Sequence, residues 1–183
     1  MAYPNKIIHN PETGQVIWFL QTSRDTAGQL LEMEATFQAC GTFPPPHYHP
    51  RQAEDFTVVA GELTVQIGQE LKVLGLGDHL HIPKGTIHSM CNRSATDTIV
   101  NWKVRPALDT ENLFEALFGL SNANHTAGRS SLTFLQKASL ARRYSAEFRL
   151  ARPSQLVQRV AFGLVAAVSS VFGYQTQQEV YLD

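Results

Sequence analysis

The sequence predicts an all-β barrel or sandwich followed by a helical C-terminal segment. Up to about residue 106, short runs of β-branched and aromatic residues are separated by Gly, Pro or Asn, and no amphipathic helix interrupts them. Beyond residue 106, apolar residues recur at helical spacing instead. Because a length of 183 residues suits one domain with an appendage, we divide the chain into a β-barrel domain at 1–106 and a helical extension at 107–183.

Eight runs of residues carry the predicted strands. The clearest is 30–37, in which apolar residues alternate with polar ones, as in a strand with one buried face. Gly61 and Gly68 end two other runs, where turns need conformational freedom. The predicted strands are 16–20, 30–37, 56–60, 63–67, 71–74, 79–82, 87–91 and 98–104. We expect the large aromatic residues of the barrel to fill its core, with one or two of them as candidates for the pocket mouth: Trp18, Phe37, Phe43, Phe56 and Trp102.

The extension is expected to contain three helical stretches. The first spans 109–120, a loop follows at 121–131, and 132–150 is helix-prone. Pro153 is well placed to open a last helix that runs to about Phe172 and is apolar almost all round. We expect this helix to pack on the barrel or on the partner in a homodimer. We favour that packing over contact of 153–178 with a membrane, which the apolar stretch is too short to span.

The composition excludes several classes of protein. A hydrophobic fraction of 43% is too high for a disordered chain, and a net charge of −1 removes the electrostatic case for nucleic-acid binding. Two cysteines cannot form a disulfide scaffold, and the first residues lack the charged-then-apolar order of a secretory signal. We therefore expect a cytoplasmic protein whose partner is a small molecule, not a nucleic acid.

The histidines are unevenly distributed, and their spacing predicts a metal site. His47 and His49 are two residues apart, so on a strand they point to the same face. Glu54 follows after a short turn, and His88 lies on a later strand that a barrel can bring alongside. Three imidazoles and one carboxylate suit a divalent first-row metal ion, of which iron, manganese, nickel and zinc are all candidates.

The same residues carry a resemblance to the cupin superfamily. Residues 41–61 match the first cupin motif, G-x5-H-x-H-x3,4-E-x6-G, and residues 77–92 match the second, G-x5-P-x-G-x2-H-x3-N. The resemblance covers roughly 15–106 and implies a small single-domain cupin, a jelly-roll β-barrel. It also implies that four side chains hold the metal ion: His47, His49, Glu54 and His88.

Two classes of function follow from this resemblance. One is a mononuclear metal-dependent dioxygenase, in which a small chelating organic substrate and dioxygen use the two positions that four protein ligands leave open on the metal. In that case Glu54 also acts catalytically, by accepting a substrate proton. The alternative is a non-catalytic protein that binds a small molecule and whose metal ion is structural or anchors that ligand.

Three further residues near the motifs are expected outside the ligand set. His79 and His81 share one face of their strand, and we expect them on the surface or in the barrel wall. If they face inward, they are candidates for acid or base groups. We expect Asn92 to stabilise a loop by hydrogen bonding.

Overall fold

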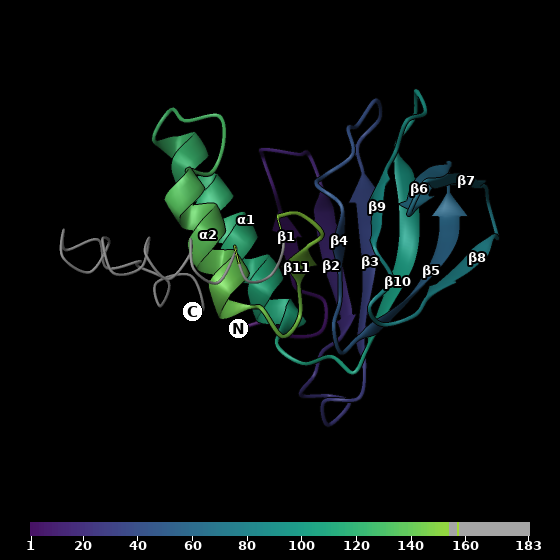
Figure 1. Cartoon of the computed structure of the whole chain (residues 1–183), viewed down its shortest axis with the longest axis horizontal. Helices are drawn as coiled ribbons and strands as arrows, with labels where there is room; N and C mark the ends of the chain where they lie inside the picture. The colour runs from purple at the N-terminus through teal and green to yellow at the C-terminus, as the bar shows by residue number, and fades with distance from the viewer. Residues whose placement is uncertain (154–156, 158–183) are drawn as a thin grey trace.

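The computed structural model describes residues 1–153 and 157, which form two antiparallel sheets and two helices (Figure 1). The strand order is β1-β2-β3-β10-β5-β8 in the larger sheet and β11-β4-β9-β6-β7 in the smaller one. The elements are β1 (Ile7–His9), β2 (Val16–Gln21), β3 (Leu31–Phe37), β4 (His47–Tyr48), β5 (Ala53–Ala60), β6 (Leu63–Ile67), β7 (Glu70–Leu74), β8 (His79–Ile82), β9 (His88–Cys91), β10 (Thr98–Arg105), α1 (Thr110–Thr126), α2 (Phe134–Arg143) and β11 (Arg149–Leu150). The prediction of an all-β barrel with an added helical segment is confirmed.

The core lies between the two sheets. On β3, Leu31, Met33 and Ala35 are fully buried, while the residues between them are half-buried. Val65 on β6 and Met90 on β9 join the same cluster from the smaller sheet. Burial of one such side chain stabilises the folded state by about 1.5–3 kcal/mol, so this cluster is the main source of the barrel's stability.

The prediction for the aromatic side chains is confirmed for Phe56 and Trp102, which are buried in this cluster. It is wrong for Trp18, which is 38% exposed. Both neighbours of Trp18 on β2 point into the core, and successive residues of a strand face opposite sides of the sheet. Phe37 and Phe43 are half-buried.

All eight predicted strands are present, with small shifts at their ends. β5 begins at Ala53 and so includes Glu54, which lies before the predicted start of that strand. Three short strands are not predicted by the sequence: β1, β4 and β11. They have two or three residues each, too few to show alternation.

The helices differ from the prediction at their C-terminal ends. α1 continues to Thr126, so the prediction of a loop at 121–131 is wrong for residues 121–126. Polar side chains of that part are buried by hydrogen bonds rather than by apolar packing: Ser121 Oγ donates to Asn10 Oδ1 at 2.6 Å. The helix-prone stretch at 132–150 contains α2 and then ends in the strand β11.

The extension packs against the barrel along α1. Phe118 of α1 is buried in the same cluster as the barrel residues, and Ala107 joins it just before the helix. The expected apolar helix from Pro153 to about Phe172, and the stretch 153–178 considered for membrane contact, lie outside the described residues except for Pro153 and Val157. Within residues 1–153 and 157, no helix combines the length and the apolar character that crossing a bilayer requires.

Candidate metal centre

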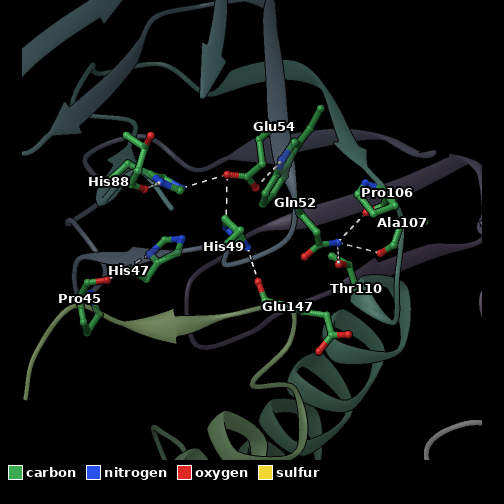
Figure 2. Close-up of polar contacts among 12 residues, drawn as sticks. Pro45, His47, His49, Gln52, Glu54, His88, Pro106, Ala107, Thr110 and Glu147 are labelled. Carbon is green, nitrogen blue, oxygen red and sulfur yellow. Dashed lines mark hydrogen bonds and ion pairs between the residues drawn. The ribbon is translucent and has the colours of Figure 1, made fainter. Parts of the chain in front are cut away.

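The structure brings together the four side chains that the sequence predicts as metal ligands (Figure 2). His47 on β4 pairs in register with His88 on β9, and His49 follows β4 directly. One ring nitrogen from each of these three histidines lies within 4.8 Å of the others. Glu54 comes from β5 in the opposite sheet, and its Oε2 lies 3.2 Å from His49 Nε2 and 3.0 Å from His88 Nε2. The candidate centre therefore lies between the two sheets.

A backbone carbonyl oxygen fixes the orientation of each imidazole. Each oxygen contacts the Nδ1 atom of one ring, in the pairs Pro45 with His47 (3.2 Å), Thr86 with His88 (2.9 Å) and Glu147 with His49 (2.6 Å). A carbonyl oxygen can only accept, so each Nδ1 carries a hydrogen and donates it. In the neutral ring this leaves the lone pair on Nε2, which is the arrangement that metal-ligating histidines use.

Three buried polar atoms at the centre have no hydrogen-bond partner in the described part of the chain: His49 Nε2, His88 Nε2 and Glu54 Oε2. His88 and Glu54 are each 1% exposed, so bulk water does not relieve the cost of burying them. Two nitrogen lone pairs and a carboxylate oxygen at this separation repel each other unless a proton or a cation lies among them. The residues therefore fit a bound divalent cation.

The charges of these groups depend on one another. Burial, together with the nearby His88 and His49, lowers the pKa of His47 to about 3, so this ring is neutral. Burial disfavours the charged forms of His49 and Glu54 as well, but their mutual attraction outweighs it. The pKa of His49 is raised, and the pKa of Glu54 is held well below its usual range by His49 and His88. A cation bound at this place would replace the imidazole proton as the positive charge beside Glu54.

Trp102 holds the second oxygen of Glu54. Its Nε1 donates to Glu54 Oε1 at 3.1 Å, and its ring packs on Phe56 with a centroid separation of 5.2 Å. The sequence predicts Trp102 in the core or at the pocket mouth, without a contact to Glu54. Alternation along β10 is the signal for the contact with Glu54. Trp102 and Val104 are two residues apart on this strand, so their side chains share a face of the sheet. Val104 pairs in register with Glu54, whose side chain points to the same face.

We expect Trp102→Phe to weaken metal binding by about 10-fold. The substitution keeps an aromatic ring in the core but removes the donor that orients Glu54, and loss of such an orienting group typically costs 10–100-fold in metal affinity. Calorimetric titration with Ni²⁺ measures the change. Trp18→Phe, the same substitution at an exposed position, is the matched control. Equal affinities for the two variants would contradict the role given to Trp102.

The other motif residues lie away from the centre. The side chains of His79 and His81 are 57% and 54% exposed, and His81 Nδ1 lies 2.7 Å from Asp55 Oδ1. Their expected surface position is confirmed. Asn92 stabilises a loop, as expected: its Nδ2 donates to two backbone carbonyl oxygens and its Oδ1 accepts from Ser94.

The extension supplies two contacts to the centre that the sequence does not predict. One is the Glu147 carbonyl oxygen that accepts from His49. The other is Phe148, whose ring centroid lies 4.8 Å from that of His47 and 6.4 Å from that of His49. Every residue has a backbone carbonyl oxygen, so the identity of residue 147 does not indicate that its carbonyl accepts from His49.

Comparison with known proteins agrees with the barrel fold. Residues 33–102 match the family model of the cupin domain. Over 79 residues the chain is 34% identical to germin-like protein 9-1 from Oryza sativa subsp. japonica, an alignment that covers 39% of this chain and 32% of that protein. The chain therefore matches about a third of the length of this curated relative.

Solved structures are similar to parts of the chain. One, described as a predicted oxalate decarboxylase from Thermotoga maritima, has a TM-score of 0.50 and 16% identity, covering 56% of this chain and 92% of that chain. Another, an RmlC-like cupin from Shewanella frigidimarina, has a TM-score of 0.49 and 21% identity, covering 61% of this chain and 94% of that chain. At 16% identity the first of these structures shows a shared fold alone. The two sheets of the described residues form a jelly-roll barrel, and His47, His49 and His88 form a group that could hold a metal ion. Residues 33–102 therefore carry a cupin domain.

Proposed function

We propose that the protein is a mononuclear metal-dependent dioxygenase that acts on a small chelating organic substrate. One observation carries the proposal: three imidazoles, each with Nδ1 bonded to a backbone carbonyl, meet a buried carboxylate between the sheets. Four protein ligands leave two positions on an ion that prefers six. A bound iron or manganese ion would supply coordination of a chelating substrate and redox chemistry with dioxygen, while nickel and zinc also suit the donor set.

The ligand side chains are largely buried, so bulk water is excluded from the candidate centre. Glu54 and His88 are each 1% exposed and His49 is 8% exposed, whereas His47 is half-buried under the ring of Phe148. His47 is the least buried of the four ligands, so this proposal places substrate entry on its side. Exclusion of water strengthens the electrostatic interactions inside such a site and prevents side reactions.

Glu54 has two roles in this proposal. As a ligand it supplies the one carboxylate oxygen of the set, and as a base it accepts a proton from the substrate at Oε2. Its pKa lies well below the usual range because of His49 and His88, so it is ionised at neutral pH. A carboxylate of such low basicity is a better ligand than proton acceptor, so the ligand role is the stronger of the two.

The proposal is tested by oxygen uptake. Protein reconstituted without oxygen with Fe²⁺, Mn²⁺, Ni²⁺ or Zn²⁺ is mixed with oxygenated buffer containing a flavonol, a β-diketone or a catechol. We expect at least one combination to consume oxygen above the metal-free rate, and His79→Ala to retain that rate. No uptake by metal-loaded protein with any of the three substrate classes would count against the dioxygenase.

A non-catalytic cupin that binds a small molecule through its metal ion is the second candidate. One observation favours it: His79 and His81 face outward, so neither provides an acid or base beside Glu54. Metal-loaded protein that consumes no oxygen but releases heat when titrated with a chelating ligand would support this alternative. The cytoplasmic location and the homodimer stay predictions of the sequence.

A further inference from the structure

The chain returns to the candidate centre after α2. Tyr144 is buried, and its carbonyl oxygen accepts from the backbone N–H groups of Glu147 and Phe148 at 3.1 and 2.9 Å, which turns the chain. Arg149 and Leu150 then form β11, which pairs with β4 so that Leu150 lies opposite His47. Ala151 N donates to Pro46 O at 2.9 Å. We call residues 144–151 the strap. It runs along the strand that carries the first metal ligand (Figure 2).

The strap differs from the barrel in how it holds a ligand. The carbonyl groups that orient His47 and His88 belong to residues only two positions earlier in the chain. The carbonyl group that orients His49 belongs to Glu147, 98 positions later, and this contact is the shortest of the three at 2.6 Å. The orientation of one imidazole therefore depends on the docking of a segment outside the two cupin motifs.

The same segment contacts the least buried ligand of the centre. The ring centroids of Phe148 and His47 lie 4.8 Å apart with an angle of 32° between the two rings, which is a tilted contact. His47 is the least buried of the four ligands, on the side where the proposed function places substrate entry. The aromatic ring next to it limits the space there and keeps water from that ligand.

We infer that the strap is a working part of the metal centre, in which the Glu147 carbonyl positions His49 and Phe148 shields His47. This inference rests on the proposed metal site. Because the strap and the metal ion both hold the same two imidazoles in place, docking of the strap and binding of the metal must favour each other. In this chain the extension, and not the barrel alone, sets the affinity of the centre.

Two substitutions separate the strap's contribution from that of the barrel. Phe148→Ala removes the ring over His47, and Ala151→Pro removes the N–H group that bonds to Pro46 without changing a side chain that touches a ligand. Phe134→Ala is the matched control, since Phe134 belongs to the same extension but is 67% exposed on α2. Titration with Co²⁺ gives the affinity, and the visible absorption of bound Co²⁺ reports its coordination.

We expect Phe148→Ala and Ala151→Pro each to weaken Co²⁺ binding by about 10–100-fold, the usual effect of losing groups that orient metal ligands, and to change the Co²⁺ spectrum. Phe134→Ala should leave both unchanged. Phe148→Leu, which keeps an apolar side chain over His47, should restore part of the affinity. A loss of stability alone would not alter the spectrum of the bound ion.

Hydrogen exchange of the unmodified protein provides a test without any substitution. Bound Co²⁺ should slow the exchange of peptides covering the strap more than that of peptides covering α2. If the unmodified protein binds Co²⁺ but the strap variants match it in affinity and spectrum, or if exchange of the strap is unaffected, the inference is overturned and the metal site stands. If the unmodified protein binds no metal, the proposed function falls and the inference falls with it.

Discussion

Replacing His88 with alanine is expected to lower metal affinity by more than about 100-fold. Loss of a group that only orients a ligand typically costs 10–100-fold, and His88→Ala removes a ligand itself. The remaining side chains cannot move in to replace it, because His88 pairs with His47 across the smaller sheet and is 1% exposed. Calorimetric titration with Ni²⁺ and the metal content after dialysis measure the loss.

His79→Ala is the matched control for this experiment. It removes an imidazole from a strand of the same barrel, but that side chain is 57% exposed and points away from the centre. We expect its affinity to stay within about twofold of the unmodified protein, as surface substitutions usually have small effects. Circular dichroism establishes that both variants are folded. A folded His88→Ala protein with full affinity would show that His88 is not a ligand.

Saturation with the preferred metal ion is expected to raise the thermal midpoint by roughly 5–11 °C. A ligand at 100 times its dissociation constant adds about 2.7 kcal/mol to the stability of the state that binds it. In a domain of this size each kcal/mol shifts the midpoint by about 2–4 °C. The metal ion also gives a bonding partner to the facing atoms of His49, His88 and Glu54, which are buried and lack hydrogen-bond partners.

Differential scanning calorimetry with a chelator and then with excess metal measures this shift. His88→Ala should have the same midpoint under both conditions, which separates binding at this centre from weak binding elsewhere. A similar rise in the variant and in the unmodified protein would mean that the stabilising ion binds at another place.

The candidate ligands could be predicted because their spacing reflects local backbone geometry. His47 and His49 are two residues apart on an extended stretch, and Glu54 lies just inside the next strand. His88 required the barrel, which the two motifs and the short alternating runs indicate together. The strand pattern likewise predicted the buried face of β3, since every second residue of that strand is apolar.

The rest of the centre depends on contacts that no local pattern encodes. The carbonyl of Glu147 reaches His49 across 98 positions, and the backbone bears no residue-specific signal. The last part of α1 is held by polar contacts such as the hydrogen bond from Ser121 to Asn10. The spacing of apolar residues therefore does not predict that the helix continues there. Trp18 was misplaced because an aromatic residue favours a strand without specifying which face it occupies.

Anomalous diffraction from crystals of the full chain grown with Ni²⁺ tests the central claim most directly. The account predicts one strong peak between the two sheets, at about 2.0–2.2 Å from Nε2 of each imidazole and from an oxygen of Glu54, distances typical of first-row metal ions with these donors. Density over the ring of His49 should show its Nδ1 still bonded to the Glu147 carbonyl. A well-ordered barrel with no peak among these four side chains, or with their donor atoms turned away from one another, would contradict it.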